Sequence, residues 1–363
     1  MYLLWEMVYN FQDVALWGMI ATSSPNSDER ARVAQWSSIG ASLGGIILMV
    51  FPIIKGDGET LGAFGFSEQQ MFMVGGLIFA LGGELISMLA YNMKERVQVE
   101  APEESIKDSL FVIRHNKTLL LISLARFLTS LSPRLQQNAY FFQSVVPGLS
   151  WTKNISSGTA MTLFDVLQGL PGAISVFFAT KFAKKLGGMK KILVVTKVLS
   201  VVMRTAAFFI GFDSLPKVTV VLVLLSIMNI PGGMLDIAHR SLTSDSIDEV
   251  ELKTGQRTEG ISFSIQNFIS KLSDATKTFI SGVLLTLLKH DSKIPESQQN
   301  PIFMKWQWPM FMLGPVVGDA LYLLAISFLE EDNDRKKEVE LLLKKKREEI
   351  REEVRASVVE AQT

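Results

Sequence analysis

Residues 189–233 read MKKILVVTKVLSVVMRTAAFFIGFDSLPKVTVVLVLLSIMNIPGG, which is two long apolar runs separated by the residues GFDSLPK. A helix that crosses the hydrocarbon layer of a membrane needs about 20 mostly apolar residues. Glycine, aspartate, serine and proline between the two runs favour a turn. This stretch therefore predicts a pair of membrane-spanning helices, at 189–212 and 217–240.

Apolar runs of similar length recur along most of the 363 residues, 48% of which are hydrophobic. The mean hydropathy is positive, at +0.27. We read seven further spans, at 2–23, 35–55, 70–93, 117–146, 157–182, 259–289 and 306–329. The pattern predicts an all-α polytopic membrane protein with about nine transmembrane helices.

Basic residues gather in alternate gaps between the spans. One set of loops carries Arg30, Lys94, Lys190 and Arg240 with further basic neighbours. The opposite loops hold only Lys55, Lys153, Lys217, Lys289, Lys293 and Lys305. Because cationic loops are retained in the cytoplasm, the basic set and the C-terminus are predicted to be cytoplasmic. We expect a multi-pass protein of the cell (plasma or inner) membrane.

The polar segment 95–116 divides the spans into two groups. We expect three helices of an N-terminal bundle in 1–94, a cytoplasmic loop at 95–116 and a six-helix C-terminal bundle in 117–330. The segment 331–363 is rich in Lys, Arg and Glu and is predicted to be a charged cytoplasmic tail helix.

Signatures of an enzyme are absent from the sequence. There is no cysteine, the three histidines are far apart, and no phosphate loop, G-x-S-x-G or H-E-x-x-H motif occurs. Lys+Arg and Asp+Glu balance at 36 each, so net charge indicates no partner. We expect no enzyme activity and no metal or cofactor, a small-molecule solute and membrane lipid as partners, and no nucleic acid.

The first span carries a row of polar and aromatic residues. Tyr9, Asp13 and Trp17 recur every four residues, so they share one helix face. A carboxylate beside an indole suits a sugar, since the carboxylate accepts hydroxyl hydrogen bonds and the ring covers the apolar side of the sugar. Asp13 could instead pair with a buried cation and hold the bundle together, but ionisable groups inside a membrane usually face a cavity.

The eighth span carries a second polar face. Asn267, Ser270, Lys271 and Asp274 lie at spacings of three and four, and Gln266 precedes them. Lys271 could neutralise a carboxylate or donate to a substrate, or it could simply pair with Asp274. The sequence leaves these two interpretations open.

Other polar residues in spans are weaker candidates. The pair Arg126 and Arg134 flanks Pro133 and predicts a bent helix that lines the pathway, while Asp319 has no partner that the sequence assigns. Close helix packing is the favoured interpretation of the motifs LPG and IPGG. The remaining candidates are Asp165, Lys197, Arg204 and Asp236.

Three segments carry a resemblance to a known family. Residues 13–46 (DVALWGMIATSSPNSDERARVAQWSSIGASLGGI), 91–97 (YNMKERV) and 244–271 (SDSIDEVELKTGQRTEGISFSIQNFISK) resemble the glycoside–pentoside–hexuronide:cation symporters. This is the melibiose permease-like group of the major facilitator superfamily. The resemblance implies helices 4–12 of a twelve-helix fold, so we expect an N-terminally truncated member.

The resemblance assigns roles to individual residues. It implies that Asp13 and Trp17 bind the sugar, and that Gln266, Asn267, Ser270 and Lys271 line the sugar side and the cation-coupling side of the eleventh helix of that fold. It also matches a cytoplasmic gate, formed by Arg257, Asp245 and Asp248. Asp236 stands where the melibiose permease has a tryptophan, and Ser38 where it has an arginine.

We therefore expect a secondary active transporter that couples a sugar or glycoside to Na⁺ or H⁺ by alternating access. The substrate residues are expected to be Asp13, Trp17, Tyr9, Gln266, Asn267, Ser270, Lys271 and Asp236, with Asp13 and Lys271 in cation coupling. Because two sugar-site positions differ, a lipid-like or other amphipathic solute is one alternative. A membrane fragment or interaction protein that does not transport is another.

Overall fold

A computed structural model describes residues 65–92, 116–135, 139–146, 157–254, 259–291, 293–295 and 298–330, and isolated positions elsewhere in the chain. The chain divides into two compact units. One comprises residues 1–103 and 156–166, and the other comprises 104–155 and 167–363. The predicted spans 2–23 and 35–55 lie almost entirely outside the described residues.

In the first unit, α3 (Glu68–Ser87) begins at a well-formed N-terminal cap and continues into η1 (Met88–Asn92). Ser67 accepts a hydrogen bond from the backbone N–H of Gln70, whose side chain in turn accepts from the N–H of Ser67. These reciprocal bonds satisfy helix-end donors that would otherwise lack partners. Gln12 donates to the Ser87 hydroxyl at 2.9 Å.

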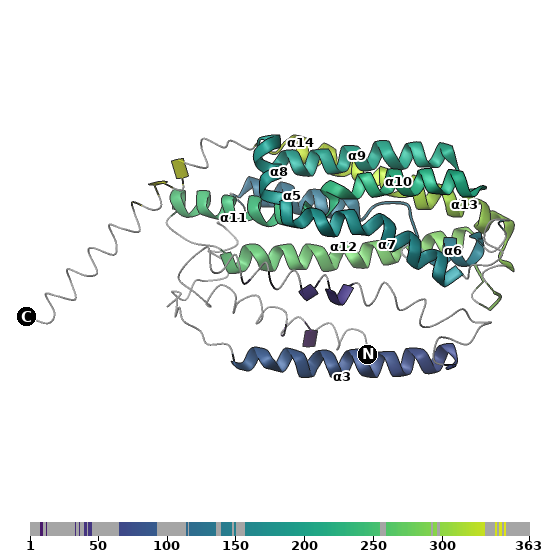
Figure 1. Cartoon of the computed structure of the whole chain (residues 1–363). Helices are drawn as coiled ribbons and strands as arrows, with labels where there is room; N and C mark the ends of the chain where they lie inside the picture. Colours follow the sequence, from purple (N-terminus) through teal and green to yellow (C-terminus); the bar gives the residue numbers. More distant parts are fainter. Residues whose placement is uncertain are drawn as a thin grey trace, which may run out of the picture. The chain divides into compact units, whose positions relative to one another are not determined.

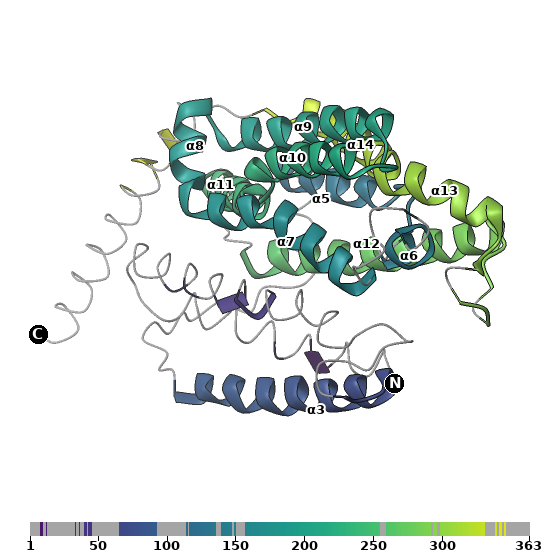
Figure 2. The ribbon, with the colours of Figure 1, turned by 45° about the vertical axis from the view of Figure 1, so that its right-hand side comes forward.

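The second unit contains a series of long helices (Figures 1 and 2). Their order is α5 (Lys117–Thr129), α6 (Ala139–Ser144), α7 (Ser157–Ser175, whose first residues belong to the first unit), η4 (Val176–Phe178), α8 (Ala179–Leu186), α9 (Met189–Ile210), α10 (Leu215–Gly232), α11 (Leu235–Thr254), α12 (Glu259–Leu287), α13 (Pro301–Met312) and α14 (Gly314–Ser327). The described residues of both units contain five helical segments long and apolar enough to span a membrane, at 69–87, 157–178, 189–210, 215–254 and 301–327.

Most of the predicted spans in the described residues coincide with helices, but several differ in detail. The span at 117–146 is broken into α5 and α6, and the break contains Pro133, which supports the predicted bend. The last span begins at Pro301 rather than at 306. The helical segment that follows GFDSLPK extends through α11 to Thr254, well beyond the predicted end at 240.

Many large apolar side chains face outward from these helices. Phe209 of α9 is 79% exposed and Phe279 of α12 is 72% exposed. Soluble proteins rarely expose so many large apolar side chains. Such surfaces fit helices that contact the acyl chains of a membrane.

The interior of the second unit is packed where α5, α9, α11 and α14 meet. Its buried residues include Ile122, Leu193, Ala238 and Tyr322. The helices α9, α10 and α14 run side by side in both views (Figures 1 and 2). The polar cavity described below lies among α5, α9, α10 and α14.

The glycines of LPG and IPGG lie where α7 crosses α10. A Cβ atom on Gly233 would lie 1.9 Å from the carbonyl oxygen of Gly172, and one on Gly172 would lie 2.8 Å from that of Asn229. Only residues without a side chain allow this approach of two backbones. The predicted packing role of both motifs is confirmed.

Candidate functional site

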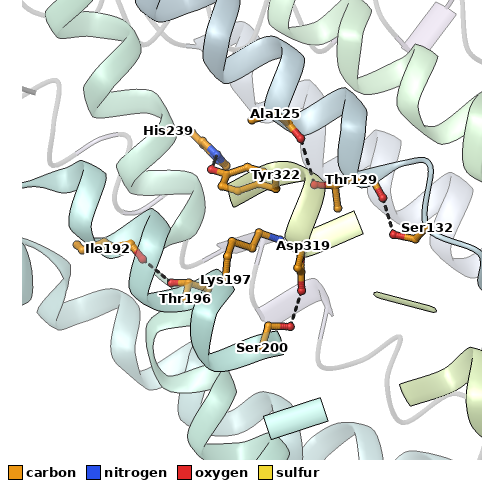
Figure 3. A network of polar contacts seen from close by, with 10 residues as sticks. All are labelled: Ala125, Thr129, Ser132, Ile192, Thr196, Lys197, Ser200, His239, Asp319 and Tyr322. Carbon is orange, nitrogen blue, oxygen red and sulfur yellow. Dashed lines mark hydrogen bonds and ion pairs between the residues drawn. The ribbon is translucent and has the colours of Figure 1, made fainter. Parts of the chain in front are cut away.

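A buried ion pair joins α9 to α14 in the second unit (Figure 3). The Nζ atom of Lys197 lies 2.6 Å from Oδ1 of Asp319, and the Ser200 hydroxyl donates to Oδ2 at 2.5 Å. The side chains of Lys197 and Asp319 are only 14% and 6% exposed. Each carboxylate oxygen of Asp319 therefore has a partner on α9.

Lys197 has a further partner, the ring of Tyr322. Its ammonium group lies 4.9 Å from the centroid of the Tyr322 ring, one helical turn after Asp319 on α14. An aromatic face attracts a cation through its quadrupole. Asp319 and Tyr322 together fix the position of Lys197.

Small residues on α14 bring this pair close to α5. A Cβ atom on Gly318 would lie 2.0 Å from the Ser132 hydroxyl oxygen, and one on Gly314 would lie 2.6 Å from the Pro133 carbonyl oxygen. The turn after α5 thus packs directly on the backbone of α14. Asp319 is consequently placed beside the segment that carries Arg134.

A cavity of about 280 Å³ surrounds the ion pair. Its described lining comes from α5 and the turn after it, α9, α10 and α14, with one residue of α11. The polar and charged residues of this lining are Thr129, Ser132, Arg134, Thr196, Lys197, Ser200, Arg204, Asn229 and Asp319.

The cavity lies close to the middle of a span. Lys197 follows the start of α9 by eight residues, which corresponds to about 12 Å of helix rise. Arg204 lies two turns further along the same helix. Charges at such depth cost about 2.5–3.5 kcal/mol each on insertion scales, so they mark functional sites by default.

A second polar network links α14 to α11 and α12. Nε2 of His239 lies 2.6 Å from the Tyr322 hydroxyl, and the Thr243 hydroxyl donates to the His239 carbonyl at 2.9 Å. Thr243 in turn accepts a hydrogen bond from the Gln266 amide. The Asn116 amide caps α5 through its oxygen and donates to the Ser246 hydroxyl at 3.0 Å.

The sequence matches the family described as MFS/sugar transport protein over residues 1–330. The chain belongs to the MFS/sugar transport protein family. It is accordingly a polytopic membrane transporter and not an enzyme. The predicted resemblance to sugar:cation symporters of the major facilitator superfamily is confirmed at the level of the family.

Curated relatives cover most of the chain. It is 27% identical to an uncharacterized symporter, YjmB, of Bacillus subtilis, over 92% of this chain and 69% of that protein. It is 25% identical to a putative sulfoquinovose importer of Escherichia coli, over 99% and 74%. A lactose permease of Leuconostoc lactis is 28% identical over 78% of this chain and 43% of its own length.

Within this family member, three of the predicted site residues lie outside the described part of the chain: Asp13, Trp17 and Arg257. Tyr9 is described and is 43% exposed. Asp236 is exposed in the first turn of α11, and the predicted gate residues Asp245 and Asp248 are half-buried further along that helix.

The predicted polar face of α12 separates into two parts. Gln266 is buried and turned toward Thr243 of α11. Asn267 and Lys271 are exposed, and Ser270 is half-buried. Asp274, the alternative partner for Lys271, forms an ion pair with Lys277, in which Nζ of Lys277 lies 2.9 Å from Oδ1 of Asp274. The described geometry therefore places Gln266 inside the bundle and Asn267 and Lys271 on its surface.

Sequence reasoning singled out Lys197 and Arg204 of this transporter but assigned no partner to Asp319. One signal was available, because Lys197 and Asp319 are opposite charges deep within two different spans. Ser200 follows Lys197 by three residues on the same helix face. Tyr322 contacts Lys197 and His239 because α14 meets α9 and α11 at this point. The spacing of residues along one helix does not predict such contacts between helices.

Proposed function

We propose that this transporter carries a sugar or glycoside together with Na⁺ or H⁺ across a cell membrane by alternating access. The observation that carries the proposal is the family match over residues 1–330. Two of the relatives reported above are named for carbohydrates, lactose and sulfoquinovose, and a third is named a symporter. These relatives do not favour a lipid-like cargo or a protein that does not transport.

In this proposal, the sugar contacts Asp13, Trp17 and Tyr9 on one helix. On α12 it meets Asn267, Ser270 and Lys271, and Gln266 holds α12 against α11. A carboxylate accepts hydrogen bonds from hydroxyl groups, and an aromatic ring packs on the apolar face of a pyranose.

Coupling is proposed to use the charges of Asp13 and Lys271. A bound cation would lower the free-energy cost of holding the charged Asp13 carboxylate within the membrane. Cation and sugar would then each increase the affinity of the site for the other. Arg257 with Asp245 and Asp248 is proposed to close the cytoplasmic side. We also propose the division into segments 1–94, 95–116, 117–330 and 331–363, with the C-terminus in the cytoplasm.

A binding measurement with a matched pair of variants tests the sugar site. The full chain is purified in detergent and titrated with a panel of pyranosides and pentosides, with and without Na⁺ and at two pH values. We expect at least one sugar to bind, and Asp13→Asn to weaken its binding about tenfold or more, because a charged hydrogen-bond acceptor is lost.

Asp213→Asn is the matched control. Asp213 is an exposed carboxylate in the loop between α9 and α10, where it pairs with Lys217 at 2.7 Å. This variant should bind sugar as the unmodified protein does. Equal affinity in both variants would remove Asp13 from the site, and no binding of any sugar would argue against the proposed cargo.

A further inference from the structure

The cavity among α5, α9, α10 and α14 holds more positive than negative charge. Its described lining contains Lys197, Arg134 and Arg204 but a single carboxylate, Asp319. Both oxygens of that carboxylate are occupied, one by Lys197 and one by Ser200. The pair of Lys197 and Asp319 is therefore neutral, which leaves two guanidinium groups to be balanced.

The two arginines have few partners of their own. Arg204 donates to the carbonyl oxygen of Phe311 at 3.3 Å, and its Nε atom is buried with no hydrogen-bond partner among the described residues. The Arg134 guanidinium makes no hydrogen bond or ion pair within that same part of the chain. A guanidinium has five N–H donors, so most donors of this pair have no partner among the described residues.

The same two arginines are neighbours. Arg134 and Arg204 both interact electrostatically with Asp319, and they repel each other. Asp319 is the acid that acts on both of them, and it is already paired with Lys197. Two like charges held together beside a cavity, within a membrane span, require a compensating charge.

We propose that this cavity is a binding site for a small oxyanion, held by Arg134 and Arg204. The planar fork of a guanidinium donates two parallel hydrogen bonds to a carboxylate, sulfonate, sulfate or phosphate group. A cavity of about 280 Å³ accommodates such a group with several water molecules. The amide of Asn229, which also lines the cavity, supplies a further polar contact.

The site is separate from the proposed sugar residues and does not depend on sugar or cation coupling. Its described lining comes from α5, α9, α10, α11 and α14, and it includes none of the residues proposed on α12. The oxyanion could be a free inorganic ion or the acidic group of a larger solute. Both share the chemistry that two guanidinium groups recognise.

The test is a titration of the full-length protein, purified in detergent, at constant ionic strength. The probes are sulfate, glucuronate and the neutral analogue glucose, and the readouts are calorimetric binding and the shift in unfolding temperature. We expect saturable binding of sulfate, glucuronate or both. Arg134→Gln and Arg204→Gln should each weaken that binding at least about tenfold, because each removes a charge-assisted bond.

Two further variants keep the proposal falsifiable. Lys217→Gln removes an exposed cation from the first turn of α10 and should leave oxyanion affinity unchanged. Asp319→Asn removes the negative charge beside the site, so the oxyanion should bind about tenfold more tightly and shift the unfolding temperature further. The oxyanion affinity of Asp319→Asn therefore tests the proposed site even if the two arginine variants fail to fold.

The outcomes separate the sources of the oxyanion. Binding of sulfate alone supports a site for an inorganic ion, whereas tighter binding of glucuronate, in competition with sulfate, supports a site for an acidic solute. Absence of saturable binding of either anion would overturn the proposal. So would unchanged affinity in both arginine variants, or weaker binding in Asp319→Asn.

Discussion

At the scale of single residues, the second unit depends on a few buried charges whose partners come from distant parts of the chain. Lys197 and Asp319 are 122 positions apart, and each is nearly enclosed. Burying a charge without its partner is far more costly than burying the pair. The stability of the second unit therefore depends on whether each buried charge lies next to its partner, and less on how many charges are buried.

Replacing Lys197 with methionine should destabilise the protein by about 3–5 kcal/mol, because Asp319 would remain buried without its ion-pair partner. The double variant Lys197→Met/Asp319→Leu should be more stable than Lys197→Met alone, since the remaining charge is removed as well. Thermal unfolding in detergent measures both effects.

Lys217→Met provides the control, because Lys217, in the first turn of α10, forms an exposed ion pair with Asp213. Its effect on the free energy of unfolding should stay within about 1 kcal/mol.

The double-variant comparison could contradict the account. If Lys197→Met/Asp319→Leu loses as much stability as the sum of the losses in Lys197→Met and Asp319→Leu, then Lys197 and Asp319 are not energetically coupled.

Tyr322→Phe should destabilise the protein by about 1–3 kcal/mol. The variant leaves the ring beside Lys197 but removes the hydroxyl that contacts Nε2 of the buried His239, and a buried group without a partner is costly. Tyr91→Phe, at a tyrosine that is 94% exposed, should have no measurable effect. If the unfolding temperatures of the two variants agree within the experimental error, the Tyr322 hydroxyl does not stabilise the protein.

At the scale of elements, apolar run length and turn residues sufficed to predict most helices of the described chain. The spans at 157–182 and 189–212 coincide with apolar helices because hydropathy reports lipid contact directly. The span at 259–289 coincides with α12, which is less apolar than these helices and is not among the five described segments apolar enough to span a membrane. The full extent of α11 was missed because its sequence is polar and its stability comes from packing against α5, α9 and α12. Such contacts between helices produce no regular spacing of apolar residues in the sequence of α11.

Gly233→Ala should destabilise the crossing of α7 and α10 by about 1–3 kcal/mol or more, because the new methyl group would lie 1.9 Å from the Gly172 carbonyl oxygen. Gly282→Ala is the matched control on α12, where a Cβ atom meets nothing within 4 Å. The comparison uses fluorescence-detected size exclusion after heating. Equal loss of folded protein in both variants would contradict close packing at Gly233.

At the scale of the whole molecule, composition and alternating charge indicated a polytopic membrane protein, the resemblance of three segments indicated a transporter, and the family match agrees with both. The site was less accessible to sequence reasoning. Residues of one helix can be grouped by spacing, as at Tyr9, Asp13 and Trp17, but the cavity around Lys197 draws residues from five helices. Only the three-dimensional arrangement shows that Asp319 is already paired, while most donors of Arg134 and Arg204 lack a partner in the described part of the chain.

Concentrative uptake by proteoliposomes is the most direct test of the central proposal, which is transport of a sugar driven by a cation. The full chain is reconstituted, an inward Na⁺ or H⁺ gradient is imposed, and entry of the radiolabelled sugar that binds best is followed with and without an ionophore. We predict accumulation above the external concentration, abolished by the ionophore that collapses the driving gradient. Entry that never exceeds the external concentration under either gradient would contradict cation-coupled transport.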